Sequence, residues 1–425
     1  MTAPLLDSLR EGVDTRLANG LRVLIVEASN IPLVHFAWIA PAGSRHDPRG
    51  LEGLASLTWP LLRAGTESMG GREIDAQTED LGADIVPRVS WDSGRLALEL
   101  LDEDWRFGLE LGWELLRRPL LPERDLEMHR RQRLRTIERA RRDPSAQSRD
   151  ALLRRFFGDS ARARNLFGNP ASLECIRRRD VVAFHSRRFC PSGMTLVCLG
   201  SLRPPAVLEH LASMPMEPRS KGDLAEAGES VAAPDLPSLE HLEIADASAA
   251  EATLGFSIPT ADEGQILEAE LLTNILGTRL RSALRERCGA SYHVNSSLFV
   301  RGDLGLLTLV AKVDPENLAL AFDQMRGEAE GLAAGRLSAA ELRLAKTVVE
   351  VETWRSFQRL PSAASALERL ARSGPVLSAF EGLAERLAST TARELEDLAA
   401  RVLCLERAGF VSASSGVPPS LRRVS

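Results

Sequence analysis

Apolar residues in the first half of the chain switch between strand-like and helix-like spacing. Residues 21–40 contain two apolar, β-branched runs separated by Ser-Asn and a proline, which predicts a strand, a turn and a second strand. After the loop "PAGSRHDPRG", Leu54, Thr58 and Leu61 fall on one face of a predicted helix. The pattern then predicts a helix at 71–83, two short strands within 84–101, long helices at 104–118 and 122–142, a helix near 179–189 and a strand at 193–201. This order is typical of an α+β unit in which helices cover one face of an antiparallel sheet.

The second half of the chain repeats this order of elements. Residues 252–277 again predict a strand, a loop and an apolar helix, residues 359–371 echo 142–157, and residues 401–415 echo 187–201. Three matching segments in the same order favour a tandem duplication. We therefore expect an α+β fold of two duplicated domains, each an antiparallel sheet with helices on one face, that together form a clam-like cleft.

Length and composition indicate where the two domains meet. A chain of 425 residues is too long for one ordinary hydrophobic core, which argues for at least two domains. Residues 214–239 are dense in Pro, Gly, Ser and Ala and show no apolar period, as expected of a linker. The sequence thus predicts an N-terminal domain at 1–213, a linker at 214–239 and a C-terminal domain at 240–425.

The net charge of the chain bears on which kinds of partner it could bind. The formal net charge is −6 and no long basic block dominates, so we expect neither nucleic acid nor a membrane as partner. Seven arginines between residues 130 and 142 indicate a helix with a solvated face or, alternatively, one that contacts an acidic partner. The first twenty residues contain no apolar run long enough for a signal peptide or a membrane span, and we expect a cytoplasmic protein.

Residues 41–66 carry a resemblance to a known family. The segments "PAGSRHDP", "GLEGLAS" and "AGT" resemble the opening signature of the M16 zinc peptidases, the pitrilysin and mitochondrial-processing-peptidase kind. The order of features resembles that family over nearly the whole chain. In M16 enzymes this helix carries an inverted zinc motif, His-x-x-Glu-His, just after Gly-Leu-Ala. The resemblance therefore implies two histidine ligands and a glutamate general base on this helix.

The positions that the resemblance assigns to these three residues hold other side chains. Aligned without a gap, they are Ser56, Trp59 and Pro60. A hydroxyl is a poor zinc ligand, an indole offers no basic lone pair, and proline has no side-chain donor atom. We therefore expect no metal ion in this chain. Pro60 should also kink or end the helix, because it removes the hydrogen bond to the carbonyl of Ser56.

The third family ligand, a glutamate about 76 residues beyond the second histidine, would fall at Thr136. Glu138 is two residues further on and would point away from the ligand face of the helix, and His129 is a lone histidine. No two of the seven histidines lie four residues apart, so the chain has no two-histidine helical zinc site. The sequence predicts a degenerate metal site in which Thr136 completes the set of replaced residues.

A proline marks the strand that follows this helix region. In active relatives the strand matching residues 82–92 accepts the substrate peptide as an added β-strand, which requires free backbone N–H groups. Pro87 removes one of them. A lost peptide-binding edge and an ordinary edge strand are both compatible with this residue.

The second half keeps a different feature of the family. "LRERCGASY" resembles the M16 segment in which the domain opposite the metal supplies an arginine and a tyrosine seven residues apart, here Arg285 and Tyr292. We expect Arg285 on the last turn of a helix, a turn at Gly289, and Tyr292 at the start of a strand. Both side chains can donate hydrogen bonds to peptide carbonyls and to charge that develops on the scissile oxygen. A surface arginine and a half-buried tyrosine without substrate remain the alternative.

The resemblance implies a function in partnership. The long glycine-rich loop of the mitochondrial enzyme's non-catalytic subunit is reduced here to "ILGTRLRSAL", which favours the small bacterial type. In that type one subunit carries zinc and its partner carries the Arg/Tyr pair. We expect a non-catalytic subunit without a cofactor of its own, paired as a heterodimer with a zinc-bearing homologue that hydrolyses peptides. The alternative is a purely structural homologue, like the related core subunits of respiratory complexes.

Overall fold

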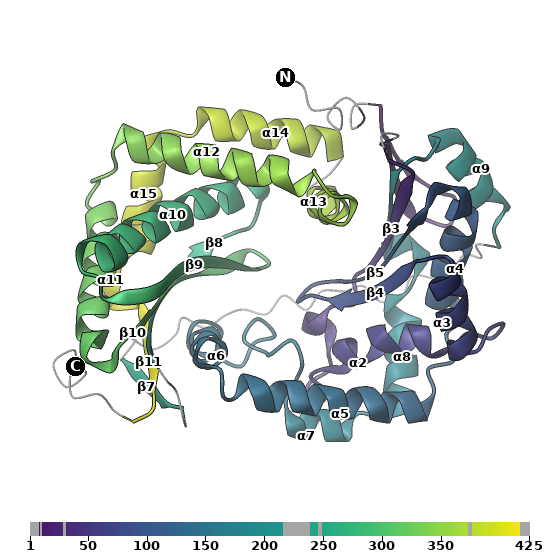
Figure 1. The fold of residues 1–425 in the computed structure, drawn as a ribbon, viewed down its shortest axis with the longest axis horizontal. Helices are drawn as coiled ribbons and strands as arrows, with labels where there is room; N and C mark the ends of the chain where they lie inside the picture. The colour runs from purple at the N-terminus through teal and green to yellow at the C-terminus, as the bar shows by residue number, and fades with distance from the viewer. Residues whose placement is uncertain are drawn as a thin grey trace. The chain divides into compact units, whose positions relative to one another are not determined.

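The computed structural model describes residues 8, 11–28, 31–215, 239–244, 249–372 and 376–416 (Figure 1). Most of the predicted linker, residues 216–238, lies outside the described residues. The chain folds into two compact units, each assembled from three stretches of sequence. The N-terminal unit comprises Met1–Arg135, Asn165–Gly228 and Trp354–Phe380, and the C-terminal unit comprises Thr136–Arg164, Glu229–Thr353 and Glu381–Ser425.

The N-terminal unit is built on a six-stranded sheet with the strand order β1-β2-β6-β3-β5-β4. Its strands are β1 (Val13–Arg16), β2 (Arg22–Glu27), β3 (Leu33–Ala40), β4 (Asp84–Val89), β5 (Gly94–Leu101) and β6 (Thr195–Gly200). Neighbouring strands are antiparallel except for β2 and β6, which run parallel. The strand with Pro87, β4, lies at an edge of this sheet.

One face of this sheet packs against α4. Two glycines of α4 let it approach the sheet closely: a Cβ on Gly112 would lie 2.3 Å from Nε1 of Trp38, and a Cβ on Gly108 would lie 2.9 Å from the side chain of Leu100. The helices in this part of the sequence are α2 (Leu54–Leu61), α3 (Gly71–Asp80), α4 (Trp105–Arg117), α5 (Glu123–Ala140), α7 (Pro170–Cys175), α8 (Arg178–Arg188) and α9 (Pro204–Ser213). The 3₁₀ turns are η1 (Ser44–His46), η2 (Leu62–Ala64), η3 (Asp102–Asp104) and η4 (Pro191–Gly193).

The other face of the same sheet is covered by a helix from the second half of the sequence. This helix, α13 (Leu360–Arg372), packs against β3 and β6. Arg95 of β5 contacts Ser365 and Glu368 of α13. Arg95 and Leu100 lie an odd number of residues apart on one strand, so their side chains point to opposite faces of the sheet. The N-terminal sheet is therefore enclosed between α4 and α13.

The C-terminal unit is built on a five-stranded sheet with the order β7-β11-β8-β10-β9. Its strands are β7 (Glu240–Glu243), β8 (Ala250–Pro259), β9 (Ser291–Arg301), β10 (Leu304–Val313) and β11 (Gly409–Ser414). Only β7 and β11 pair in parallel. The helices in this part of the sequence are α10 (Glu263–Arg281), α11 (Leu318–Ala333), α12 (Ala339–Ser356), α14 (Val376–Ser389) and α15 (Ala392–Val402), with a π-helical turn, η5 (Ser282–Arg287), and 3₁₀ turns η6 (Pro315–Asn317) and η7 (Leu405–Arg407).

The C-terminal sheet is also covered on both faces. Leu254 and Phe256 of β8 join the main core with residues of α10, α11 and α15. Gly255 points the other way, where a Cβ would lie 2.9 Å from Leu152 of α6 (Pro144–Phe157). Ser145 of the same helix donates a hydrogen bond to Glu251 of β8. The first half of the sequence thus supplies the helix that closes this face.

These findings confirm the α+β class and the repeated order of elements, and they correct two details. Each sheet contains one parallel pair, so neither is purely antiparallel. Helices cover both faces rather than one, because the echoed segments, α6 and α13, each belong to the unit of the other half. The predicted ranges 1–213 and 240–425 are continuous halves of the sequence. In the structure each compact unit also includes a segment of the other half: Thr136–Arg164, with α6, belongs to the C-terminal unit, and Trp354–Phe380, with α13, belongs to the N-terminal unit. The expected cleft stays a prediction.

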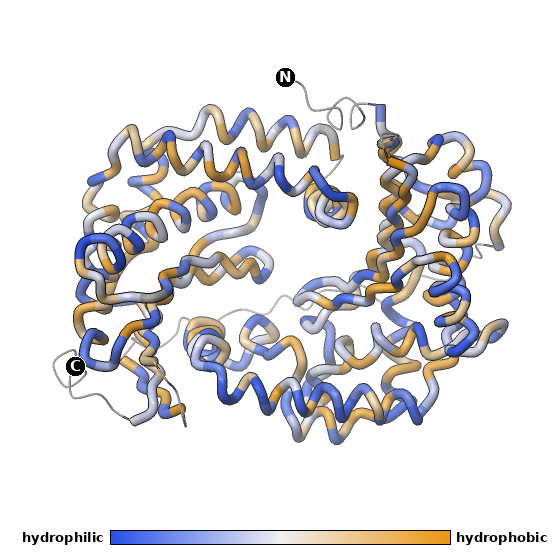
Figure 2. Tube along the Cα trace, viewed as in Figure 1, coloured by the Kyte–Doolittle hydropathy of each residue, from blue (hydrophilic) through white to orange (hydrophobic). Residues whose placement is uncertain are grey.

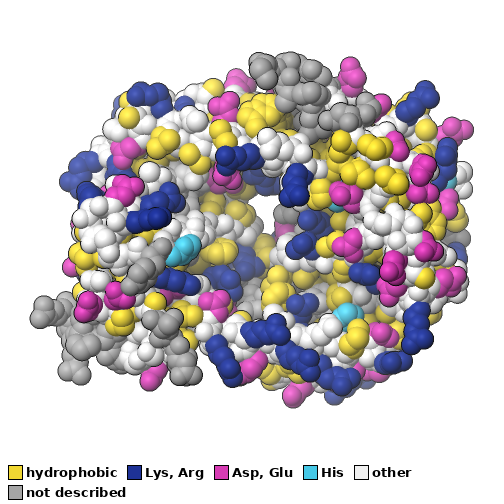
Figure 3. All heavy atoms as spheres, in the orientation of Figure 1, with side chains coloured by type: hydrophobic (Ala, Val, Ile, Leu, Met, Phe, Trp, Pro, Cys, Tyr) yellow, Lys and Arg dark blue, Asp and Glu magenta, His cyan; other side chains and the backbone are white. Residues whose placement is uncertain are grey.

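Hydropathy follows this layering. In Figure 2 the strands of both sheets are rich in hydrophobic residues, whereas α5 is mostly hydrophilic. Basic side chains gather over α5 in Figure 3, in agreement with the predicted arginine-rich face. None of the helices within the described ranges is both long and apolar enough to cross a membrane.

Candidate functional site

The helix that carries the metal ligands in M16 enzymes forms here as α2. It begins after Gly53, whose backbone lies in the left-handed region that favours glycine. Gly53 has φ +97, and its backbone N–H donates to Oδ2 of Asp47 at 2.7 Å. Oδ1 of Asp47 accepts a second bond from the N–H of Ala55 at 2.8 Å. The buried carboxylate therefore satisfies the first turn of α2 and complements the positive end of the helix dipole.

Ser56 and Trp59 are packed into the protein instead of facing a ligand. The Ser56 hydroxyl donates to the carbonyl oxygen of Gly53 at 2.8 Å. Nε1 of Trp59 donates to the carbonyl oxygen of Ala42 at 2.9 Å, and the indole lies 4.8 Å from the ring of Phe189. Trp59 is only 1% exposed, so its indole fills the space on this side of α2.

Pro60 ends the regular helix, as expected, and leaves the carbonyl of Ser56 without its helical donor. The α-helix stops at Leu61 and continues as the 3₁₀ turn η2. Nη2 of Arg133, on α5, donates to the Ser56 carbonyl oxygen at 3.1 Å. The same guanidinium lies 4.2 Å from the centre of the Phe167 ring, and burial lowers the pKa of Arg133. An arginine thus replaces the missing backbone N–H.

The other predicted positions of this site lie on α5. Thr136 is half-buried and follows Arg133 by three residues, so both lie on the same side of the helix. Glu138 is exposed and forms an ion pair with Arg141 at 3.4 Å. His129 contacts Gln132, with 3.2 Å between Nδ1 and Oε1, and its pKa is lowered, chiefly by burial.

These residues do not fit a zinc ion. In the part of the chain that the structure describes, no three His, Cys, Asp or Glu side chains are grouped so that they could hold a metal ion. The α2 positions present an internally bonded hydroxyl, an indole and a proline. Arg133 adds a cation beside them, and a fixed positive charge opposes metal binding.

Two outward backbone positions of the edge strand β4 are not available to an added strand. Ser90 donates to Ser93 across the hairpin at 2.8 Å, so by alternation the backbone groups of Ile85 and Pro87 point away from β5. Pro87 has no N–H to offer there. The carbonyl of Ile85 accepts a hydrogen bond from Nη1 of Arg63 at 2.9 Å. β4 is an edge strand whose outward donors and acceptors are reduced, which is compatible with both readings of Pro87.

Arg285 lies on an exposed turn that its neighbours fix in place. It belongs to the π-helical turn η5, where sequence analysis expected an α-helical one. The turn closes through the N–H of Ala290, which donates to the Leu284 carbonyl at 2.8 Å, and Gly289 has φ +62 as expected of the turn residue. No described residue forms a hydrogen bond or ion pair with the Arg285 side chain.

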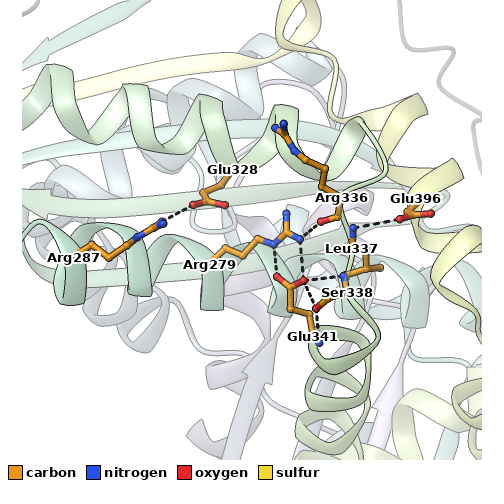
Figure 4. Close-up of polar contacts among 8 residues, drawn as sticks. All are labelled: Arg279, Arg287, Glu328, Arg336, Leu337, Ser338, Glu341 and Glu396. Atoms are coloured by element: carbon orange, nitrogen blue, oxygen red, sulfur yellow. Dashed lines mark hydrogen bonds and ion pairs between the residues drawn. The ribbon is translucent and has the colours of Figure 1, made fainter.

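Two ion pairs hold the flanks of this turn (Figure 4). Nη2 of Arg287 lies 2.9 Å from Glu328 of α11. Arg279 contacts Glu341 of α12 through Nε at 2.6 Å and Nη2 at 3.1 Å. The hydrogen bonds from Arg279 lower the pKa of Glu341 to about 2. Arg279, before Arg285, and Arg287, after it, thus each form an ion pair with a carboxylate.

Tyr292 is the extra residue of a β-bulge. In the ladder with β10, Ser291 pairs with Val313 and His293 pairs with Lys312, which leaves Tyr292 unpaired between them. The Ser291 hydroxyl lies 2.8 Å from the carbonyl of Lys312 and fixes the bulge. The side chain of Tyr292 lies outside the described atoms. Bulges re-aim a side chain and are frequent beside functional sites.

Sequence reasoning missed the contribution of Arg133. Pro60 signals that the Ser56 carbonyl needs another donor, but the sequence offers six arginines on α5 and does not indicate which one reaches it. The role of Asp47, which caps α2, does not follow from its place in the loop before the helix. The turn at Arg285 and the start of the strand at Tyr292 were placed correctly to within one residue.

Comparisons with known proteins cover most of the chain. The family model of "Insulinase (Peptidase family M16)" matches residues 22–169, and that of "Peptidase M16 inactive domain" matches residues 176–349. A protein of Mycobacterium tuberculosis described as an uncharacterized zinc protease is 26% identical over 353 residues, covering 78% of this chain and 77% of the relative. A protein of the same description in Streptomyces coelicolor is 22% identical over 412 residues, covering 92% and 86%.

Solved structures share the fold. A peptidase M16 inactive domain from Pseudomonas fluorescens superposes with a TM-score of 0.83 at 22% identity, covering 96% of this chain and 98% of that chain. A protease from Helicobacter pylori superposes with a TM-score of 0.84 at 16% identity, covering 95% and 99%. At these identities the likeness is one of architecture.

Proposed function

Because the chain belongs to the M16 peptidase family, we propose that it is the non-catalytic subunit of a heterodimeric zinc peptidase. A zinc-bearing homologue would hydrolyse the peptide, and this chain would contribute Arg285 and Tyr292 to peptide binding. The proposal assigns no metal ion and no cofactor to this chain.

The observation that carries the proposal is the contrast between the two candidate sites. At the α2 site, Ser56, Trp59 and Pro60 are buried or built into local packing, and Arg133 supports the backbone that Pro60 leaves unpaired. At the η5 site, Arg285 is exposed, whereas its neighbours Arg279 and Arg287 are held by carboxylates. Because Arg285 is exposed on a fixed turn and pairs with no described residue, its guanidinium is available to a ligand.

The chemistry of the pair suits a peptide backbone. A guanidinium presents five N–H donors in a planar fork, and a phenol adds one O–H donor. Donors held on rigid elements are already oriented when negative charge develops on a carbonyl oxygen, so they stabilise the transition state without reorganising. The partner's zinc would supply the activated water and polarise the scissile carbonyl. This chain's own task would be to bind and orient the peptide.

Co-purification tests the partnership. The tagged chain is drawn from its native cell extract, and zinc content and peptide cleavage are measured with and without the companion that elutes with it. We expect zinc and cleavage only when a homologue with His-x-x-Glu-His is present. Stoichiometric zinc or cleavage in the chain alone would contradict the proposal. Stable assembly with a homologue, but without any effect of Arg285 or Tyr292 on cleavage, would favour a purely structural subunit.

A further inference from the structure

Arg133 is a half-buried cation whose charge no described carboxylate balances. Within the described part of the chain, its guanidinium forms one hydrogen bond, to the Ser56 carbonyl, and one ring contact, with Phe167. Neither partner carries a charge. Burial is the single cause that lowers the pKa of Arg133, as expected of a cation with no anion close by. Removing a charge from water is unfavourable unless it is paired, so an anion bound at Arg133 would stabilise this part of the fold.

One edge of this guanidinium is left for a ligand. Phe167 covers a face of the guanidinium, with 4.2 Å between its central carbon and the ring centre, and Nη2 donates to Ser56. Nε is enclosed and bonds to no described atom. Nη1 likewise forms no hydrogen bond with a described residue, but it keeps contact with solvent. A ligand can therefore reach the end of the fork, which Nη1 forms together with Nη2.

Titratable neighbours do not supply the missing negative charge. His129 lies one helical turn before Arg133, and its pKa is lowered chiefly by burial and further by the charges of Arg133 and Arg63, so the imidazole is neutral at pH 7. Arg63 is already paired with Asp75 at 3.1 Å. Asp125 raises the pKa of His129, yet it is not a cause of the pKa shift at Arg133. Arg133 is thus the unbalanced charge of this group.

The unbalanced charge lies at the degenerate metal site. Arg133 bonds to the carbonyl of Ser56, the residue that aligns with the first histidine of the M16 motif. It also lies on α5, the helix on which the third metal ligand would fall, and precedes Thr136 by three residues. A zinc ion and a guanidinium are both positive, but zinc binds lone pairs directly, whereas a guanidinium binds oxygen atoms through its N–H groups. The site therefore keeps a positive charge and changes the kind of ligand that the charge can bind.

We propose that Arg133 binds a carboxylate group of a ligand at the degenerate metal site. A carboxylate presents two oxygen atoms in one plane, and these match two N–H donors of one guanidinium. A phosphate is commonly held by free N–H groups at the start of a helix, but two N–H groups at the start of α2 are bonded to Asp47. The carboxylate is the C-terminus of a peptide or an acidic side chain. This binding goes beyond the proposed role of Arg285 and Tyr292 and requires no partner subunit.

Three short peptides test carboxylate binding with the full-length chain alone. Each alternates Ala and Gly over about six residues and carries a neutral aminobenzoyl group at its N-terminus. The first ends in a free carboxylate, the second ends in an amide, and the third is the amide with one Glu at its centre. We expect the first or the third peptide to bind about tenfold or more tightly than the second, because a hydrogen bond between two charged groups is lost in the second. The peptide that binds identifies whether a terminus or a side chain supplies the carboxylate.

A double substitution separates ligand binding from the bond that Arg133 makes to Ser56. Pro60→Ala restores a backbone N–H that can bond to the Ser56 carbonyl, so Arg133→Met in this background leaves no carbonyl unpaired. We expect Pro60→Ala to bind the preferred peptide as the parent does, and Pro60→Ala/Arg133→Met to bind it about tenfold or more weakly. Arg131→Met is the matched control, because it removes one positive charge from a side chain of α5 that is 67% exposed, and it should bind as the parent does.

Equal binding of all three peptides, or equal binding by Pro60→Ala and the double variant, would overturn the carboxylate site. Displacement of the peptide by inorganic phosphate but not by acetate would overturn the choice of a carboxylate, and an equal loss in Arg131→Met would show that net charge alone attracts the peptide. Circular dichroism verifies that the variants are folded. If the double variant is not folded, Arg133→Lys provides the test, since it keeps the charge, loses the fork and should weaken binding. These measurements use the chain alone, so their failure would not affect the role proposed for Arg285 and Tyr292.

Discussion

The guanidinium of Arg133 takes the place of a backbone N–H on α2, donating to the carbonyl oxygen of Ser56 over 3.1 Å. The need for this bond arises from Pro60, which follows Ser56 by one helical turn and has no N–H of its own. A buried carbonyl without a partner is unfavourable, so the substitution at Pro60 and the position of Arg133 are energetically linked. The helix that carries metal ligands in the M16 enzymes is stabilised here by two side chains, the Asp47 carboxylate at its start and the Arg133 guanidinium at the Ser56 carbonyl.

This linkage predicts a non-additive pair of substitutions. Arg133→Ala should lower the free energy of unfolding by about 1–3 kcal/mol, because it leaves the Ser56 carbonyl unpaired. In a Pro60→Ala background the new backbone N–H can bond to that carbonyl, and the same substitution should cost less. Urea unfolding of the four chains measures the difference.

Arg131→Ala is the matched control on α5, since its side chain is 67% exposed. It should change the free energy of unfolding by no more than about 0.5 kcal/mol. An equal cost of Arg133→Ala with and without Pro60 would show that the two residues are independent.

The packing of Trp59 against Gly94 gives a second prediction. A Cβ on Gly94 would lie 2.1 Å from Cε2 and Nε1 of the buried indole, so Gly94→Ala should destabilise the fold by about 3 kcal/mol. Thermal unfolding measures the shift. Gly70→Ala is the control, because no atom lies within 4 Å of its Cβ position and its φ is −72. An unchanged melting temperature for Gly94→Ala would mean that Trp59 does not fill this space.

The ion pair of Arg279 and Glu341 predicts a pH-dependent contribution to stability. The pKa of Glu341 is about 2 in the fold, below its ordinary value of 4.5. A carboxyl with a depressed pKa stabilises the fold above pH 4.5 and loses this contribution as the pH falls toward 2. Glu341→Gln should therefore lower the free energy of unfolding by about 1 kcal/mol at pH 7, because the pair is only partly buried, and by less at pH 3.

Denaturant unfolding at the two pH values checks this expectation. The exposed Glu316 provides the control, and Glu316→Gln should have little effect at either pH. A Glu341→Gln penalty that is the same at pH 3 and pH 7 would exclude ionisation of this carboxyl as its source.

Much of the fold follows from spacing along the sequence, and the exceptions have physical causes. The apolar periods located β2, β3, α2 and α10 because burial on one face dictates them. The echo between residues 142–157 and 359–371 identified α6 and α13 as equivalent helices. Nothing local shows that each of them packs on the sheet of the other half, because this depends on which faces remain open after the rest has folded.

The candidate site divides in the same way. Ser56, Trp59 and Pro60 were located by alignment with a motif, and Gly289 by the backbone freedom that its turn requires. The bond from Arg133 to Ser56 and the π-helical form of the turn at Arg285 depend on contacts between distant segments. The bulge at Tyr292 depends on register with β10, which a strand's own sequence does not specify.

Turnover of the reconstituted complex tests the central claim most directly. The chain, or its Arg285→Ala, Tyr292→Phe or Arg281→Ala variant, is combined with the zinc-bearing homologue, and kcat/KM is measured for a peptide substrate. Arg281 is the control because it is exposed and lies one helical turn before Arg285. We predict that Arg285→Ala and Tyr292→Phe each lower kcat/KM by about 10–1,000-fold while Arg281→Ala does not. Unchanged kcat/KM for both variants, with assembly and zinc content intact, would contradict the account.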